Sequence, residues 1–238
     1  IKNGIKVFIG SLPHEAEMRF KRSAEEKKCE LFILNNFVKQ SEESVSLMIK
    51  DKNYNIYSTG LVGYHQLKNA SLAVKTINEV LGIDNDLIFN KGLKDVIANS
   101  GIQGRYEIFH KKPRIIFDAA HNVEGVQVFI REFEKEYTDY SERNLIFGAM
   151  QDKNIEEMLK IVSPFFDNIY ITSVNYERST KIEEIHEITK KLNIKTNSLV
   201  NPEEEILRMI KKGGNECLSV IGSIYLIGEI KLKIENNS

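Results

Sequence analysis

The 238-residue chain has few of the features that mark secreted, membrane-bound or nucleic-acid-binding proteins. Its only cysteines, Cys29 and Cys217, lie far apart in the sequence. We expect them to be buried free thiols in a reducing cytosol, with a single disulfide as the alternative. No apolar run approaches the roughly 20 residues that cross a bilayer, and the opening residues lack the basic, apolar and small-residue order of a secretory signal. These absences predict a cytoplasmic protein without a membrane partner.

An excess of charge of either sign is also missing. Lys and Arg number 33 against 34 Asp and Glu, which leaves a net charge of -1. This balance gives no electrostatic argument for nucleic-acid binding, so small molecules are the expected partners. Hydrophobic residues make up 42% of the chain, enough for a sizeable core. The length exceeds one typical domain of about 100–150 residues and predicts two domains.

The first part of the chain alternates short strands and helices. Apolar spacing predicts strands at residues 5–9 and 31–34, a hairpin of residues 44–50 and 53–58, and helices at 13–28, 65–81 and 84–98. Gly82 is expected to end the second of these helices as a C-cap. The inward face of that helix is predicted to consist of Leu67, Ala70, Leu72, Ala73, Ile77 and Val80.

A glycine-containing segment then divides the chain. Residues 100–104 (SGIQG) interrupt the pattern, so we predict a first domain at 1–99, a linker at 100–104 and a second domain at 105–238. In the second domain, expected strands at 105–110, 113–118, 144–148, 168–173 and 217–222 alternate with helices at 123–137, 154–162, 181–191 and 203–212. This alternation is typical of an α/β, Rossmann-like fold with a mostly parallel sheet and helices on both faces.

Polar residues follow three strands of the second domain, and ligands of parallel sheets bind beyond the carboxyl ends of the strands. Asp118 ends an apolar strand and can accept hydrogen bonds from ribose hydroxyls, while His121 and Asn122 open a helix that favours an anion. Lys153 follows the next strand and can hold a carboxylate or phosphate, and Ser223 follows the last. The alternatives are a turn aspartate, a solvated histidine and lysine, an N-cap asparagine and a simple Gly-Ser turn.

A further ligand-binding pattern lies in the first domain. Gly63 leads into a helix on which His65 and Asn69 are four residues apart and share a face. The small residues Ala70 and Ala73 beside them leave room for a planar ligand. The alternative is a capped helix with exposed polar residues.

Five segments together resemble the folylpolyglutamate synthase/dihydrofolate synthase family of the Mur ligase superfamily. They are GYHQLKNASLA at 63–73, GRYE at 104–107, FDAAHNVEG at 117–125, FGAMQDKN at 147–154 and IGSIYLIGE at 221–229. The opening IKNGIKVFIG also resembles the segment after that family's magnesium-binding region. The resemblance covers essentially the whole chain.

The resemblance implies a role for each matched residue. Asn69 matches the asparagine that contacts the adenine of ATP, Arg105 an interdomain arginine that reaches the phosphates, and Asp118 an aspartate near the ribose. His121 matches a histidine near the transferred phosphate and the incoming glutamate, so His121 and Arg105 are the expected catalytic residues. By looser analogy, Lys153 and Ser223 hold the glutamate carboxylates. Ala119 stands where the family often has glycine, which we expect to be harmless.

One family element is absent from this sequence. No G-x-x-G-K-[ST] loop, whose backbone amides and lysine hold ATP phosphates, occurs in it. The sequence opens at Ile1 rather than Met, and we expect this loop, the magnesium ligands and a carbamylated lysine to precede it. The first domain is thus expected to be part of the central ATPase domain, with no metal ligand of its own, and the chain alone to be inactive.

The reaction that the resemblance implies uses ATP, Mg²⁺, L-glutamate and a folate or dihydropteroate. The folate carboxylate takes the γ-phosphate of ATP, and the amine of glutamate then attacks the acyl phosphate. We expect a monomer in which the half-sites around Asn69 and around Asp118 with His121 share one nucleotide across the linker. The alternatives are a Mur-type ligase of cell-wall precursors and a truncated, non-catalytic nucleotide- or amino-acid-binding module.

Overall fold

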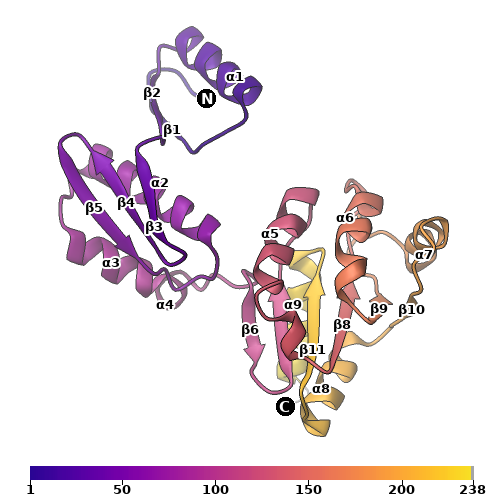
Figure 1. Ribbon diagram of the computed structural model, residues 1–238. Coiled ribbons are helices and arrows are strands. Elements are labelled where there is room, and N and C mark those ends of the chain that lie inside the picture. The colour runs from indigo at the N-terminus through magenta and orange to yellow at the C-terminus, as the bar shows by residue number, and fades with distance from the viewer. Residues whose placement is uncertain (237–238) are drawn as a thin grey trace. The chain divides into compact units, whose positions relative to one another are not determined.

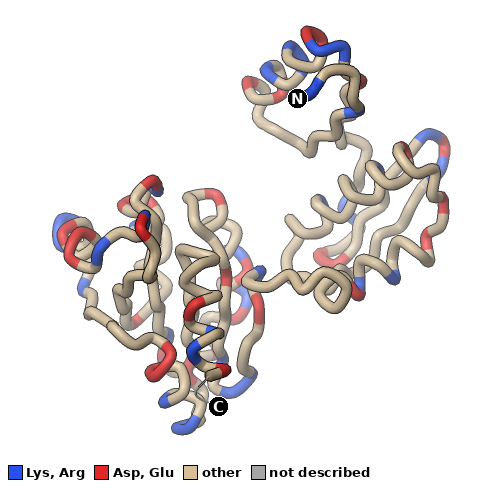
Figure 2. The backbone as a smooth tube through the Cα atoms, turned by 180° about the vertical axis from the view of Figure 1, so that it is seen from behind, with Lys and Arg blue, Asp and Glu red and all other residues tan. Residues whose placement is uncertain are grey.

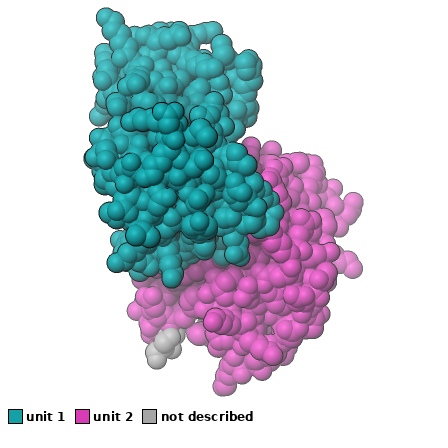
Figure 3. All heavy atoms as spheres, turned by 60° about the vertical axis from the view of Figure 1, so that its left-hand side comes forward, with its two compact units in different colours: residues 1–102 teal, residues 103–238 magenta. Residues whose placement is uncertain are grey.

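The computed structural model describes residues 1–236 of the 238 (Figure 1). The chain forms two compact units, residues 1–102 and 103–238, which Figure 3 colours separately. The division falls inside the glycine-containing segment 100–104. Each unit is described by itself below.

Unit 1 begins with a small parallel β-α-β motif. Strand β1 (Lys6–Ile9) pairs in parallel with β2 (Glu30–Ile33), and helix α1 (His14–Glu26) connects them. The rings of Phe8 and Phe32 stack with their centroids 4.6 Å apart across the two strands. These elements confirm the strands and the helix predicted for this region.

A three-stranded antiparallel meander follows, made of β3 (Phe37–Ser41), β4 (Ser44–Ile49) and β5 (Lys52–Tyr57). The predicted hairpin is confirmed, with its turn at Lys50 and Asp51. Alternate residues of β4 and β5 are buried, as expected for a sheet with one face on the core. This core is completed by α2 (Tyr64–Leu81) and α3 (Asp86–Lys94).

Helix α2 has a different inward face from the predicted one. Its buried apolar stripe is Leu67, Ala70 and Val74, whereas Ala73 and Val80 are exposed. At 100° per residue, Ala73 and Val80 lie more than about 100° around the helix from Leu67, so they cannot reach the sheet that Leu67 covers. The predicted C-cap is confirmed, because Gly82 is left-handed at φ 65°.

The single helix predicted at 84–98 is wrong. The structure has α3 and a separate short helix, α4 (Val96–Ser100), with Asp95 between them at φ -91° and ψ 14°. In a continuous helix the Leu93 carbonyl would accept a hydrogen bond from Ile97. Instead it accepts one from the Gly60 N–H at 3.0 Å. A tertiary contact from the preceding loop thus replaces a helical hydrogen bond at the break.

Unit 2 is built on a six-stranded sheet of order β10-β9-β8-β11-β7-β6. All neighbouring pairs are parallel except β6 with β7. The strands are β6 (Glu107–His110), β7 (Arg114–Asp118), β8 (Glu142–Phe147), β9 (Asn168–Ile171), β10 (Asn197–Ser198) and β11 (Glu216–Ile221). The predicted α/β fold with a mostly parallel sheet is confirmed.

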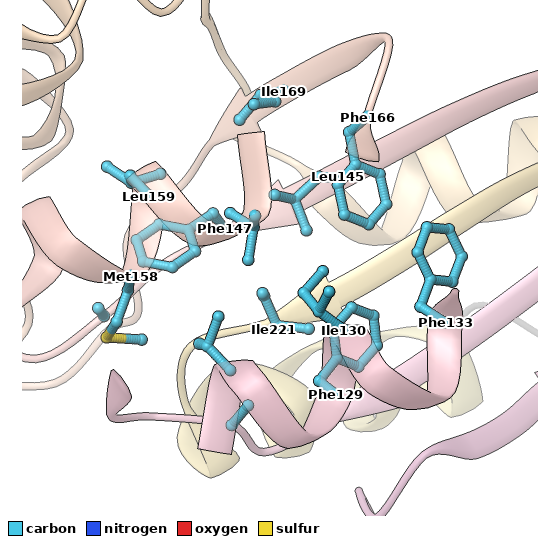
Figure 4. Close-up of a cluster of buried hydrophobic side chains, with 14 of the residues drawn as sticks. Phe129, Ile130, Phe133, Leu145, Phe147, Met158, Leu159, Phe166, Ile169 and Ile221 are labelled. Atoms are coloured by element: carbon cyan, nitrogen blue, oxygen red, sulfur yellow. The ribbon is translucent and has the colours of Figure 1, made fainter. Parts of the chain in front are cut away.

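Helices cover both faces of this sheet, as predicted. On one face lie α5 (Val123–Phe133), α6 (Ile155–Val162) and α7 (Ile182–Lys191), and on the other α8 (Pro202–Lys212) and α9 (Ile224–Asn236). Successive residues of one strand enter opposite cores; Phe147 belongs to the first and Ile146 to the second. Figure 4 shows the first core, where Phe133 of α5 stacks on Phe166 at 4.9 Å.

Some elements lie outside the predicted ones. They are β3, β10, α9 and two short 3₁₀ helices, η1 (Tyr137–Asp139) and η2 (Ser163–Phe165). Helix α5 ends at Phe133, earlier than the predicted 137. Both cysteines are unpaired, but only Cys217 is fully buried, because the Cys29 thiol lies in a partly exposed position where it donates to the Lys2 carbonyl at 2.9 Å.

The surface properties follow the composition. Figure 2 shows basic and acidic residues interspersed along each unit, in line with the net charge of -1. Within the part of the chain that the structure describes, no helix combines the length and apolar character needed to span a bilayer.

Candidate active site at the carboxyl edge of the sheet

Three adjacent strands of unit 2 end at the same level. The register pairs Ile221, the last residue of β11, with Asp118 at the end of β7 on one side and with Phe147 at the end of β8 on the other. The residues that follow these strands therefore emerge side by side at one edge. The structure thus brings together the strand ends that lead to Asp118, His121, Lys153 and Ser223.

Asp118 is held at this edge by two backbone donors. Its Oδ2 accepts from the Tyr106 N–H at 2.7 Å and its Oδ1 from the Ala120 N–H at 2.8 Å. Burial raises the pKa of Asp118 from 3.8 to about 6, against the opposing effects of these two hydrogen bonds and of the Arg105 charge. The carboxyl group is thus largely screened from water, and both of its oxygens already accept hydrogen bonds from backbone N–H groups.

The turn before β6 presents Arg105 to solvent. Gly104 and Tyr106 are buried and have positive φ angles of 65° and 47°, while Arg105 between them is exposed. The Gly104 carbonyl accepts from the Ala119 N–H at 2.8 Å. A Cβ at Gly104 would come within 3.2 Å of Ile227, so glycine suits both the space and the backbone angle.

His121 and Asn122 begin helix α5. The Asn122 Oδ1 accepts from the Gly125 N–H at 2.7 Å, which confirms Asn122 as an N-cap. The exposed His121 has its Nδ1 2.9 Å from the Ala119 carbonyl. Because a carbonyl can only accept, this contact assigns the proton of neutral His121 to Nδ1 and leaves Nε2 as an acceptor.

Ser223 lies at a close crossing of the β8 and β11 exits. Gly222 has φ 112°, and a Cβ there would lie 2.4 Å from the Gly148 carbonyl oxygen. Ser223 itself is 1% exposed, and its Oγ accepts from the Tyr225 N–H at 3.2 Å as the cap of α9. The hydroxyl proton of Ser223 stays available for donation, so substrate binding by Ser223 stays a prediction.

Lys153 lies beside a cavity of about 300 Å³ near the amino ends of α6 and α7. Its Nζ is 2.6 Å from the Asp152 carboxylate. The cavity is also lined by Gln151, Asn154, Ile155, Glu156, Thr180, Glu184 and Ile188. A ligand carboxylate at Lys153 would therefore have to replace the Asp152 carboxylate as the partner of Lys153. Substrate binding by Lys153 also stays a prediction.

The loop after β9 reaches the same edge and was absent from the predicted site. The ring of Tyr176 in this loop stacks on Tyr225 of α9, with centroids 4.5 Å apart and planes 14° apart. The Arg178 guanidinium lies 5.6 Å from the Tyr176 ring centroid. The strand predicted at 168–173 precedes this loop. The rule that ligands bind beyond the carboxyl ends of parallel strands, applied to this strand as to the other three, would have identified the loop.

Asn69 lies on α2 in unit 1. It is exposed, and its Nδ2 donates to the Gln66 Oε1 at 3.2 Å. A groove of about 420 Å³ lies beside it, lined by Asn69, Leu72, Ala73, Thr76 and Ile77. The exposed Ala73 lines this groove, whereas Ala70 is buried in the core of unit 1. The planar-ligand site stays a prediction.

No metal centre is formed by the residues that the structure describes. Nowhere in residues 1–236 do three or more His, Cys, Asp or Glu side chains come together so that they could hold a metal ion.

Comparison with known proteins agrees with the motifs. The chain is 25% identical over 245 residues to the dihydrofolate synthase/folylpolyglutamate synthase of Bacillus subtilis, a match that covers 99% of this chain and 56% of that protein. It is 28% identical over 128 residues to the UDP-N-acetylmuramoyl-L-alanyl-D-glutamate--2,6-diaminopimelate ligase of Helicobacter pylori, covering 51% of this chain and 28% of that one. The chain spans about half the length of the first of these relatives.

Solved structures show the same fold. Mycobacterium tuberculosis folylpolyglutamate synthase complexed with ADP matches with a TM-score of 0.80 at 17% identity, over 96% of this chain and 55% of that one. A bifunctional folylpolyglutamate synthase/dihydrofolate synthase with Mn, AMPPNP and L-glutamate bound matches with a TM-score of 0.77 at 15% identity, over 98% of this chain and 54% of that one.

The resemblance to folylpolyglutamate synthase/dihydrofolate synthase sequences is thereby confirmed along nearly the whole chain. The family model for the Mur ligase, glutamate ligase domain matches residues 104–222, half of the chain and most of unit 2. The chain belongs to the Mur ligase family that contains this glutamate ligase domain.

Proposed function

We propose that this chain is part of an ATP-dependent ligase that adds L-glutamate to the γ-carboxylate of a folate. The observation that supports this most is the edge of the unit 2 sheet, where the exits leading to Asp118, His121, Lys153 and Ser223 are adjacent in a glutamate ligase domain. The names of its relatives point to the same reaction and add dihydrofolate synthesis as a second reaction.

The proposed reaction has two steps. An oxygen of the folate carboxylate attacks the γ-phosphorus of ATP, and the bond between that phosphorus and the β,γ-bridging oxygen breaks to release ADP. The glutamate nitrogen then attacks the acyl carbon, and the carbon–oxygen bond to phosphate breaks. Phosphorylation is needed because a free carboxylate is a poor electrophile with a poor leaving group. A divalent metal, which accompanies AMPPNP in a Yersinia pestis structure, would neutralise phosphate charge when bound.

Each proposed residue has a part that its position supports. The exposed Arg105 guanidinium neutralises charge that develops on the transferred phosphate. His121, with its Nδ1 proton on the Ala119 carbonyl, has Nε2 available to accept a proton from the attacking amine. Asn69 contacts the adenine beside the groove on α2. Lys153 and Ser223 bind the carboxylates of glutamate.

The direct test is a ligation assay on the product of the complete gene, because the chain spans about half the length of its relatives. The mixture contains ATP, a divalent metal, L-glutamate and a folate or dihydropteroate, and both ADP and the glutamate-extended product are measured. We expect Arg105→Ala to lower the ligation rate about 100-fold or more while the melting temperature stays unchanged.

A matched control for Arg105→Ala is Lys111→Ala, which removes an exposed cation of the same unit from the hairpin turn before β7. This control should ligate at the normal rate. Parallel losses of rate and of stability in Arg105→Ala would contradict a catalytic arginine.

A second candidate is a Mur-type ligase of cell-wall precursors, which the similarity to the Helicobacter pylori protein supports. The amino-acid substrate separates the two: we expect turnover with L-glutamate and none with 2,6-diaminopimelate.

A non-catalytic binding module is the third candidate function. Calorimetry with the 238-residue chain tests it, since we expect this chain by itself to hydrolyse little or no ATP. The cytoplasmic location and the monomeric state stay predictions.

A further inference from the structure

Three residues near the start of unit 2 form a turn with an unusual backbone. Gly104 and Tyr106 both adopt positive φ angles, 65° and 47°, and both are buried, whereas Arg105 between them is exposed. A positive φ is accessible to glycine but strained for tyrosine. The turn at 104–106 therefore needs tertiary restraints to keep its shape, and that shape is what directs the Arg105 side chain outward.

Most of these restraints act on either side of Arg105. The Gly104 N–H donates to the Glu107 carboxylate at 2.8 Å, and Lys231 of α9 pairs with Glu107. On the other side, the Tyr106 hydroxyl donates to Glu136 at 2.7 Å. These contacts fix the two ends of the turn and leave the central peptide to another group.

Asp118 holds that central peptide. The Tyr106 N–H belongs to the peptide bond between Arg105 and Tyr106, and the Asp118 Oδ2 accepts from it at 2.7 Å. The Asp118 Oδ1 accepts from Ala120 at 2.8 Å, which anchors the carboxylate to its own strand exit. One carboxylate thus ties the end of β7 to the backbone from which Arg105 projects.

We propose that Asp118 is a positioning residue, whose carboxylate fixes the Arg105–Tyr106 peptide and so presents the Arg105 guanidinium to the phosphates of the nucleotide. This inference uses the phosphate contact given to Arg105 in the proposed function. The positioning role differs from a direct contact of Asp118 with the ribose. A positioning Asp118 acts through Arg105, so its effect does not require a ribose in the ligand.

Two anions separate these roles. Tripolyphosphate has the charged groups of ATP but no ribose. Asp118→Asn keeps the size of the side chain but places an amide NH₂ against one of the two N–H donors, so one hydrogen bond is lost. If Asp118 acts through Arg105, the variant weakens the binding of both ATP and tripolyphosphate. If Asp118 contacts only the ribose, it weakens the binding of ATP alone, and the inference is overturned.

A double-mutant cycle with Arg105→Ala measures the coupling in calorimetric titrations of the product of the complete gene. Each single variant should raise the Kd of tripolyphosphate about tenfold, the effect of losing one charge-assisted hydrogen bond. The double variant should show no more than about a twofold further rise, because both changes remove the same interaction. Additive effects would overturn the inference. The control Asp139→Asn replaces an exposed aspartate just before β8, at the opposite edge of the sheet, and should change nothing.

Nuclear magnetic resonance gives a readout that does not depend on anion affinity. In Asp118→Asn we expect the Tyr106 amide and the Arg105 Nε–H resonances to shift and the Tyr106 amide to exchange faster with solvent. The Asp139→Asn spectrum should keep both resonances in place. Unmoved resonances in Asp118→Asn overturn the inference. If the resonances move but Arg105→Ala leaves anion binding intact, the positioning stands and the proposed role of Arg105 fails.

Discussion

Replacing Gly222 by alanine should open the carboxyl edge of the unit 2 sheet. Gly222 has φ 112°, and an added Cβ would lie 2.4 Å from the Gly148 carbonyl oxygen and 3.1 Å from its carbonyl carbon. Both atoms belong to the backbone, so no side-chain rotation relieves the contact. The loops after β8 and β11 must move apart to accept the methyl group.

The size of this effect follows from two costs. An L side chain at a disfavoured positive φ costs about 1–3 kcal/mol, and overpacking a close contact costs about 1–3 kcal/mol. Gly222→Ala should therefore lower the free energy of unfolding by about 2–6 kcal/mol. Urea denaturation followed by far-ultraviolet circular dichroism measures this change.

Gly228→Ala is the matched control. Gly228 lies on α9, is exposed, and would place its Cβ with no other atom within 4 Å. Alanine there should raise the free energy of unfolding by about 0.5–1 kcal/mol, because it favours the helix more than glycine does. If the two variants unfold at the same urea concentration, the close approach of Gly222 to Gly148 is not a constraint and the reasoning is refuted.

Three further changes probe other parts of the chain. Because the pKa of Asp118 is raised from 3.8 to about 6, its contribution to stability is present below pH 3.8 and is lost as the pH rises through 6, by about 3 kcal/mol. In Asp118→Asn this loss should be absent, so the urea midpoints at pH 4 and pH 7 should differ by less than they do in the unchanged protein. An equal difference in both proteins would count against the raised pKa. Phe133→Ala, at a fully buried ring stacked on Phe166, should cost about 3–5 kcal/mol in the same assay; a cost below 1 kcal/mol would contradict the packing. Asn85→Ala removes the cap that accepts from two N–H groups of α3 and should cost about 1 kcal/mol, and no change would show that the cap is dispensable.

Sequence reasoning located most elements of unit 2 because their patterns are local. The segment 144–148 (NLIFG), for example, has a short apolar centre between Asn144 and Gly148, which is typical of a buried parallel strand. The cap signals were equally local, since Asn122 and Gly82 stand at the helix ends that the structure shows. Helix α9 was outside the prediction because its residues follow the Gly-Ser turn without a strong polar face.

The helix break at Asp95 could not be predicted from the helix itself. Residues 84–98 have adequate helix spacing, and the break coincides with a hydrogen bond from Gly60, more than thirty positions earlier in the sequence. The inward face of α2 was wrong for a similar reason. Apolar residues occur on more than one side of that helix, and only the position of the β4–β5 sheet decides which side is covered.

The candidate site shows the same division. Residue types and order were enough to identify Asp118, His121, Lys153 and Ser223 as polar residues after strands and to indicate the family. The sequence did not show which oxygens of Asp118 accept hydrogen bonds. It also did not show that Ser223 is a buried cap or that Tyr106 has a positive φ.

By itself, then, the sequence determined the α/β class, most strand and helix positions and the family of unit 2, since these depend on periodicity and short motifs. The tertiary structure alone decided that β7, β11 and β8 end side by side, that Gly222 crosses Gly148, and that Asp118 holds the backbone beside Arg105. Each of these joins segments that are distant along the chain, and such contacts arise from packing rather than from any local preference.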